Sequence, residues 1–372
     1  MNKAKALNIG NISTNIIIDK LEKLFVGMVN LKDDDGTFLG AVESRGDIDY
    51  VDFNTWEWPQ GIGLYGLVKY YKKTNDQKVL DILTKWFDNK IEEGLPDKNV
   101  NTFAPMLSLA YLYEITGNDK YGDICKSWAK WLIEEMPRTE ENGFQHVVSE
   151  RLNEGQLWDD TLMMCVLFLA KMGKLLQNSE YVEEAKYQTL VHIKYLVDTK
   201  TGLFFHGFTF DGRHNFANAL WGRGNCWLTI FIPDLIEILD ENDNAFILYI
   251  KEALKSQVKA LKKYQHESGM WHTLIDDPNS YVETSATSGF GYGILKGIRL
   301  GILDKEIYSE VGLKALEAVL GYISDDGQVD QVSYGTPMGH DLDFYRNIPI
   351  TPMAYGQSLA ILLLIESLEY KA

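Results

Sequence analysis

A short motif repeats along this chain: an acidic or polar residue, then a glycine, then alternating apolar and polar residues. Its copies contain Gly36, Gly143, Gly202, Gly269 and Gly327. From Gly143 onward the copies are about 60 residues apart, and the interval before Gly143 is about twice as long. The segment Leu95–Asn101 occupies the place of the missing copy. Six units of about 60 residues therefore account for the whole chain, a period that is typical of repeated architectures.

Each unit predicts a tight turn between two short strands, followed by an apolar helix. The apolar helices are expected over 58–73, 102–116, 158–176, 218–239, 285–300 and 353–369. A more amphipathic helix follows each of the first five. The helix expected over 14–29 fits as the outer partner of the last apolar helix.

Six buried helices that alternate with six half-buried ones predict an all-α protein with an (α/α)6-barrel fold. The buried helices would form an inner ring, with the turns gathered at one end. The alternative is an open α-solenoid, which would expose capping helices at both ends of the stack. A solenoid gives no reason for a turn and an aromatic cluster before every inner helix. No Pro/Ser-rich linker interrupts the pattern, so we expect residues 1–372 to form a single barrel domain.

The net charge is −17, from 36 basic and 53 acidic residues, which argues against nucleic acid or an anionic membrane as a partner. No apolar run is long enough to cross a bilayer, and the N-terminus lacks the apolar core of a signal peptide. Cys125, Cys165 and Cys226 lie far apart in apolar contexts, as reduced packing residues do. We therefore expect a cytoplasmic protein, either a monomer or a homodimer.

The stretch Gly155–Leu176 carries the strongest indication of chemistry. Trp158, Asp159 and Asp160 precede a run that is apolar on nearly every face, the pattern of a buried helix. The two acids lie in its first turn, where free N–H groups and the helix dipole favour negative charge. For Asp159 an N-cap role is as good an interpretation as a functional one. Asp160, at the start of a buried helix beside a tryptophan, is the candidate for proton transfer.

If the barrel is correct, aromatic and polar residues from all units meet at the end where the inner helices begin. The candidate binding residues are Trp58, Asn101, His146, Asp159, His206, Trp221, Arg223, Trp227, Ser285 and His340. A cup of aromatic faces with a few polar groups suits sugar rings, although any single tryptophan is more often a core residue. Arg223, between two tryptophans, is either a salt-bridge partner or a two-pronged grip for an anionic ligand. His192, in an outer helix, is expected to be structural.

Several segments together resemble glycoside hydrolase family 105, the unsaturated rhamnogalacturonyl hydrolases and their relatives. They are LWDDTLMM, GLFFHGF, ALWGRGNCW, and GMWHTLID followed by ETSATSGFGYGILKGI. The resemblance runs from about Trp56 to the C-terminus and is specific as a set. It implies that Asp160 is the catalytic residue. The sugar-site residues that it implies are His146, His206, Trp221, Arg223 and Trp227.

The resemblance also implies hydration of a C4=C5 double bond in a terminal unsaturated uronic acid, on an oligosaccharide of the pectin type. Asp160 would protonate C4 and then take a proton from the water that adds at C5. Burial beside Trp158 and Asp159 is expected to raise the pKa of Asp160. Asn101 stands where some relatives have a second Asp, so Asp160 is expected to act as both acid and base. No cofactor is expected, and no metal-ligand spacing occurs in the sequence.

Three alternatives remain at this point. An inverting glycosidase on the same barrel would pair Asp160 with Glu57 or Asp341, with the carboxyl groups roughly 6.5–9.5 Å apart. A sugar 2-epimerase would use His206 with His272 or His340 as acid and base. A non-catalytic sugar-binding protein would keep the aromatic cup and would tolerate the loss of Asp160.

Overall fold

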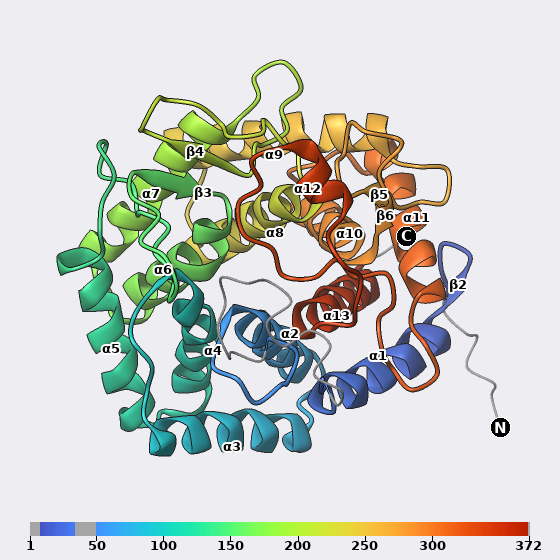
Figure 1. Cartoon of the computed structure of the whole chain (residues 1–372). Coiled ribbons are helices and arrows are strands. Elements are labelled where there is room, and N and C mark those ends of the chain that lie inside the picture. The colour runs from blue at the N-terminus through green and yellow to red at the C-terminus, as the bar shows by residue number, and fades with distance from the viewer. Residues whose placement is uncertain (1–7, 34–49, 371–372) are drawn as a thin grey trace.

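The computed structural model describes residues 8–33 and 50–370. Its principal helices form two concentric rings, seen along the barrel in Figure 1. The inner helices are α2 (Trp58–Thr74), α4 (Val100–Thr116), α6 (Leu167–Leu175), α8 (Gly222–Leu239), α10 (Thr284–Arg299) and α13 (Ala354–Glu369). The outer helices are α1 (Thr14–Val29), α3 (Gln77–Glu93), α5 (Asp119–Glu134), α7 (Ser179–Leu196), α9 (Ala245–Tyr264) and α11 (Lys305–Gly321). The predicted alternation of inner and outer helices is confirmed.

The inner ring is closed. Each inner helix packs against the next, and α13 packs against α2, so the last unit meets the first. The outer helix α1 packs against α13, as expected for a partner supplied from the start of the chain. This closure rules out the open solenoid, whose two ends would not meet.

The inner helices, whose sequences are apolar on nearly every face, are buried on most sides, whereas the amphipathic outer helices bury one face. Helix α4 is buried along most of its length, whereas α5 buries one stripe that includes Trp128 and Leu132. Local signals set where these helices begin. Asn99 and Thr102 form a reciprocal capping box at the start of α4, and Asn118 caps α5.

The repeated glycines lie in turns that fasten neighbouring units together. Gly202, Gly269 and Gly327 have φ values of +82°, +88° and +83°, which a residue with a side chain rarely adopts. A Cβ on Gly269 would meet the carbonyl oxygen of Lys314 in α11 at 2.5 Å, and one on Gly327 would meet that of Lys23 in α1 at 1.9 Å. Glycine is therefore required because each of these turns lies directly on the outer helix of its own unit. The expected copy at Gly36 falls outside the described residues.

The described strands are short and antiparallel. They are β1 (Asn8–Ile9) with β2 (Ile12–Ser13), β3 (Gln156–Trp158) with β4 (Gly207–Thr209), and β5 (Trp271–His272) with β6 (Val282–Glu283). In the second pair, Trp158 lies opposite Gly207, which brings the segment before Asp159 beside the one that carries His206. The helix after Asp160 opens with a π-helical turn, η1 (Leu162–Val166), before α6. Such turns are frequent at functional sites.

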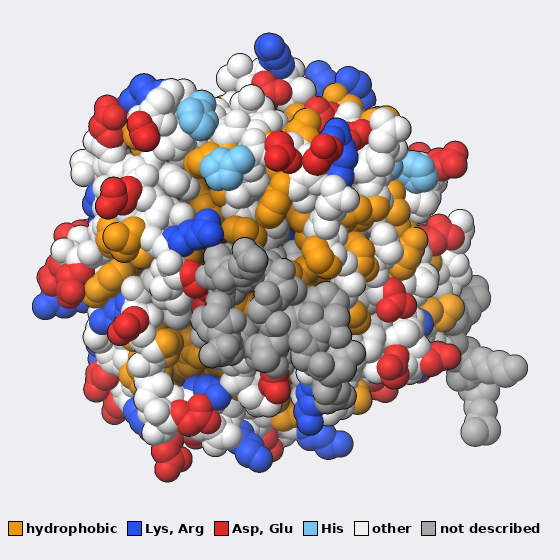
Figure 2. Space-filling view, in the orientation of Figure 1, with side chains coloured by type: hydrophobic (Ala, Val, Ile, Leu, Met, Phe, Trp, Pro, Cys, Tyr) orange, Lys and Arg blue, Asp and Glu red, His pale blue; other side chains and the backbone are white. Residues whose placement is uncertain are grey.

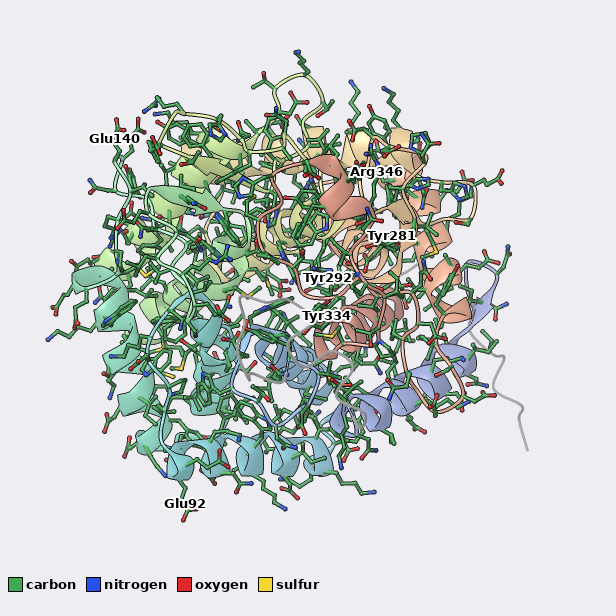
Figure 3. All side chains as sticks on the ribbon, in the orientation of Figure 1. Glu92, Glu140, Tyr281, Tyr292, Tyr334 and Arg346 are labelled. Atoms are coloured by element: carbon green, nitrogen blue, oxygen red, sulfur yellow. The ribbon has the colours of Figure 1, made fainter. Side chains whose placement is uncertain are left out.

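A buried ion pair ties the far ends of three inner helices. The Asp234 carboxylate of α8 accepts hydrogen bonds from Lys296, from the Tyr65 hydroxyl (2.7 Å) and from the Tyr292 hydroxyl (2.6 Å). Tyr292 is labelled in Figure 3. Burial raises the pKa of Asp234, but the nearby charges of Lys296 and Lys69 outweigh burial and hold that pKa below its usual range. The charge is thus compensated on several sides, as a buried carboxylate requires.

Among the described residues, no helix is long and apolar enough to cross a membrane. Cys125, Cys165 and Cys226 are buried and unpaired, as expected for packing residues.

His192 provides a test of this packing through the pH dependence of stability. Its ring is fully buried in α7, and Nδ1 is 2.7 Å from the Gln188 carbonyl oxygen. Burial lowers its pKa to about 4, against about 6.5 in an unfolded chain. Between these values only the unfolded state binds the proton, so the free energy of unfolding should fall as the pH is lowered, by about 1.4 kcal/mol per pH unit. The burial-lowered pKa of about 3 at His146 acts in the same direction.

The measurement is urea unfolding at about pH 7 and about pH 5 for the wild type and His192→Gln. The variant should lose less stability on acidification because it has no buried imidazole to protonate. An equal loss in both proteins would show that His192 does not titrate as its burial requires.

Candidate active site

A pocket opens at the end of the barrel where the inner helices begin. Its lining residues are Trp58, Asn101, His146, Val148, Glu150, Arg151, Asn153, Gln156, Trp158, Asp160, Met164, Phe216, Trp221, Arg223, Thr336, Pro337, Met338 and His340. They come from the starts of inner helices and from the loops that precede them. The surface in Figure 2 shows apolar and histidine side chains side by side on this face of the barrel.

Most of the residues predicted from the sequence meet here. Those that line the pocket are Trp58, Asn101, His146, Asp160, Trp221, Arg223 and His340. Trp227 and His206 lie directly behind the pocket wall, each in contact with Asp160. Ser285 is fully buried and its hydroxyl donates to Glu283, the N-cap of α10, at 2.5 Å. Ser285 is absent from the pocket lining, so the geometry gives no support to its predicted sugar contact.

Asp160 is the carboxylate at the centre of the site. Trp227 donates from Nε1 to Asp160 Oδ1 at 3.2 Å, and His206 Nε2 lies 3.3 Å from Oδ2. The other ring nitrogen of His206 is 2.7 Å from the Tyr345 hydroxyl, which fixes the orientation of the imidazole. The Asp160 side chain keeps 17% of its surface exposed, on the pocket side. A carboxyl group held in this way can exchange protons with a bound ligand.

Asp159 is enclosed behind it. The residue is fully buried, and its carboxyl group meets the side chain and the backbone N–H of Asp160, with no other hydrogen-bond partner among the described residues. A Cβ on Gly224 would meet Asp159 Oδ2 at 2.3 Å, so only a glycine leaves room for this carboxyl group. The helix start has no side-chain cap bond at the second or third helical N–H, so the structure gives no support to the N-cap interpretation of Asp159.

The two neighbouring acids have opposite pKa shifts. Burial, followed by the charge of Asp160, raises the pKa of Asp159 well above its usual range. Burial also raises the pKa of Asp160, but the hydrogen bond with His206 and the charge of His206 outweigh burial and lower it. The expectation that Asp160 has the raised pKa is therefore wrong for the free protein. The pair holds one proton on Asp159 and one negative charge on Asp160.

His146 forms part of the pocket wall as a neutral ring. It stacks on Trp158 with ring centroids 4.0 Å apart and an interplanar angle of 9°, and Nδ1 is 2.9 Å from Thr161 Oγ1. Burial lowers its pKa to about 3, so His146 carries no charge at neutral pH.

Arg223 is anchored more firmly than the sequence suggested. Its two terminal nitrogens donate to Ser333 and, at 3.0 Å, to the Tyr334 carbonyl oxygen, while Nε has no partner among the described residues. The guanidinium group lies 4.4 Å from the Trp221 ring centroid and 4.9 Å from that of Tyr355. Tyr334, labelled in Figure 3, belongs to the loop that Arg223 holds in place. Both terminal nitrogens are therefore engaged by the protein, and a grip by the whole guanidinium fork is excluded; Nε is buried.

The residues invoked by the rival schemes lie elsewhere. Glu57 is the N-cap of α2, with its Oε2 bonded to the Trp58 N–H at 2.9 Å. Asp341 caps the short helix α12 (Leu342–Arg346), which Arg346 anchors through Asp277 at 2.7 Å (Figure 3). His272 Nδ1 contacts the Ser280 carbonyl oxygen. None of these three candidates lines the described pocket, whereas His340 does.

Several lining residues were not predicted from the sequence. They come from two loops, one with Glu150, Arg151 and Asn153, the other with Thr336, Pro337 and Met338, together with Phe216. The loops have no helical period and no repeated spacing, so they carried no signal. Gln156 was closer to detection, because it stands two residues before Trp158 in the stretch Gly155–Leu176 that was singled out.

Three groups with metal-binding atoms meet in the structure although the sequence shows no ligand spacing. One atom each from Asp159, Asp160 and His206 lies within 4.8 Å of the other two. Asp159 fits a metal poorly, since ligands must be deprotonated and burial keeps this carboxyl neutral.

Comparison with known proteins places the chain in a family of carbohydrate enzymes. The model of Glycosyl Hydrolase Family 88 matches residues 15–371. The unsaturated rhamnogalacturonyl hydrolase YesR of Bacillus subtilis (strain 168) is 31% identical over 324 residues, which cover 86% of this chain and 92% of YesR. The chain therefore belongs to Glycosyl Hydrolase Family 88 and is a glycoside hydrolase.

Two solved structures support the resemblance to family 105. A possible member of that family from Salmonella enterica is 50% identical with a TM-score of 0.94, and the match covers 96% of this chain and 95% of the other. A possible member from Klebsiella pneumoniae is 46% identical with a TM-score of 0.92, over 99% of both chains. The predicted family and the (α/α)6 barrel are both confirmed.

The acidic cluster yields a prediction about metals. Because Asp159 holds a proton and Asp160 is paired with His206, activity should not depend on a divalent ion. Turnover after dialysis against a chelator should equal that of the untreated enzyme. Loss of turnover in the chelator, with recovery on adding one divalent ion, would assign the cluster to a metal.

Proposed function

We propose that this glycoside hydrolase hydrates the C4=C5 double bond of a terminal unsaturated uronic acid on pectin-type, rhamnogalacturonan oligosaccharides, and so releases that uronic acid. The observation that carries the proposal is the placement of Asp160, whose carboxylate faces the pocket between Trp227 Nε1 and His206 Nε2. The nearly full-length match to an unsaturated rhamnogalacturonyl hydrolase supports the substrate class.

The reaction adds one water molecule to the enol ether. Asp160 delivers a proton to C4, and the positive charge that develops at C5 and the ring oxygen accepts a water molecule. Asp160 then takes the proton that this water releases, so the carboxyl group returns to its starting state. The hemiketal formed at C5 opens to a ketone and leaves a hemiacetal at C1. This hemiacetal collapses to an aldehyde and releases the remaining sugar together with the glycosidic oxygen.

Asp160 must hold a proton before it can donate one. In the free protein its pKa is lowered through His206. The substrate brings a uronate carboxylate into the pocket, and a like charge nearby disfavours the ionised form of Asp160. Substrate binding therefore raises the pKa of Asp160 and drives its protonation.

The uronate ring fits the deeper part of the pocket. Trp58 is 7% exposed, and Trp221 and Arg223 are each 1% exposed, so these groups form an enclosed wall. Arg223 lines the pocket and stabilises the substrate carboxylate by its positive charge.

A two-carboxylate scheme has less support. Among the described residues that line the pocket, the second carboxylate is Glu150, which accepts a hydrogen bond from the Tyr50 hydroxyl at 2.7 Å. Asn101, at the position of a second acid in some relatives, lines the pocket as a neutral amide. A single carboxyl that acts in turn as acid and base agrees with both observations.

Three broader expectations belong to the same proposal. Residues 1–372 form one catalytic domain, since the ring uses helices from α1 to α13. The protein acts in the cytoplasm, where its three unpaired cysteines stay reduced. It is a monomer or a homodimer.

Asp160→Asn and Asp159→Asn test the assignment as a matched pair. Asn has nearly the shape of Asp but delivers no proton, so Asp160→Asn should lower kcat by roughly 10²–10⁴-fold on an unsaturated disaccharide while binding persists. Asp159→Asn replaces one neutral buried group by another and should keep most of its turnover. The assay follows the loss of ultraviolet absorbance of the enol ether. The reverse ranking would show that Asp159 is the catalytic acid, and two active variants would place the site elsewhere.

A further inference from the structure

Phe216 lines the outer part of the pocket with its backbone in an unfavourable conformation. It lies between β4 and α8, is half-buried, and has φ = +52°. A bulky residue in the left-handed region is an outlier, because its Cβ crowds the backbone. Such strain persists where the surroundings fix the residue, and it concentrates at binding sites.

Local hydrogen bonds hold Phe216 in place. Its N–H donates to His214 Nδ1 at 3.0 Å. The adjacent Asn215 side chain donates to the carbonyl oxygens of Tyr195 and Gly207, at 3.1 and 3.0 Å. Gly207 begins β4, and β4 pairs with β3, which ends just before Asp159 and Asp160. The loop that carries Phe216 is therefore bonded to one strand of the pair beside Asp160.

The surroundings of the Phe216 ring suit a sugar. The rings of His214 and His340 make edge contacts with it, at centroid distances of 5.5 and 5.6 Å and angles of 79° and 81°. Pro337 and Met338 add apolar surface to the same pocket. Glu150, Arg151 and Asn153 supply hydrogen-bonding groups from another loop. An apolar platform with polar groups around it matches the C–H face and the hydroxyl edges of a neutral sugar ring.

Depth within the pocket indicates which ring of the oligosaccharide lies against Phe216. Trp58, Trp221 and Arg223 are almost fully buried, whereas Phe216 is half-buried and Arg151 and His340 are exposed. The uronate that reacts with Asp160 occupies the enclosed part. The next ring of the oligosaccharide, which is the one released, therefore lies in the outer part beside Phe216.

We propose that Phe216 is the stacking platform for the leaving sugar. This rests on the proposed function, and it adds a specificity-determining residue for the aglycone. The strained backbone keeps the ring in position before substrate arrives, so no ordering of the platform is needed on binding.

The test compares two substrates that share the unsaturated uronate. One carries a neutral 6-deoxyhexose or hexose as the leaving group, and the other is the methyl glycoside, which has no second ring. Phe216→Ala should lower the ratio of kcat/KM for the disaccharide to that for the methyl glycoside by roughly three- to tenfold, as the loss of one aromatic stacking contact does. Phe216→Trp, which keeps a flat ring, should restore most of this ratio.

Phe210→Ala is the matched control. Phe210 follows β4, is half-buried against Tyr195 and Phe208, and does not line the described pocket. Its removal should leave the substrate ratio at the wild-type value. If the Phe216→Ala ratio equals that of the wild type or of the control, Phe216 is not the platform. Damage to the fold alone would lower kcat/KM for both substrates together and leave the ratio unchanged.

Two further measurements distinguish a loss of stacking from a change in backbone strain, and a failure of this inference from a failure of the proposed function. Phe216→Gly relieves the backbone strain, so it should melt at a higher temperature than Phe216→Ala and share its reduced ratio. Failure of the wild type to consume any of these substrates would instead refute the proposed function, and this inference with it.

Discussion

Asp159 and Asp160 are neighbours in the chain, and their surroundings in the barrel stabilise the ionised form of only one of them. Asp159 is fully enclosed over Gly224, where burial and the charge of Asp160 raise its pKa. Asp160 has Trp227 and His206 within hydrogen-bonding range and faces the pocket. Environment rather than residue type therefore decides which acid stays protonated, the same physical rule by which other carboxyl pairs divide their roles.

The rest of the barrel fixes the groups around this pair. Strand β3 carries Trp158 to the pair, β4 follows His206, and α8 begins with the segment that supplies Arg223, Gly224 and Trp227. Ser333 accepts from Arg223 and from the Tyr355 hydroxyl, so one loop links α8 and α13. Parts of the site that are far apart in sequence are thereby held on rigid elements, as precise chemistry requires.

The sequence was enough to predict the two rings of helices, because the glycine repeat and the two kinds of helix are local signals. It also placed Asp160, Trp221 and Arg223 at one site. It did not predict the direction of the Asp160 pKa shift, since that depends on His206, which is distant in sequence. Nor did it predict the anchoring of Arg223 by the 333–334 loop or the strained backbone of Phe216, because loop geometry leaves no periodic trace.

The central claim is that Asp160 protonates C4 of the unsaturated uronate, and turnover in D₂O observed by NMR tests it most directly. The account predicts that early product carries one new deuteron at C4 and has lost the double bond, and that Asp160→Asn forms this species at a strongly reduced rate. A released uronate that retains its C4=C5 bond without deuterium would show cleavage at the glycosidic carbon instead. That result would contradict hydration as the reaction of this barrel.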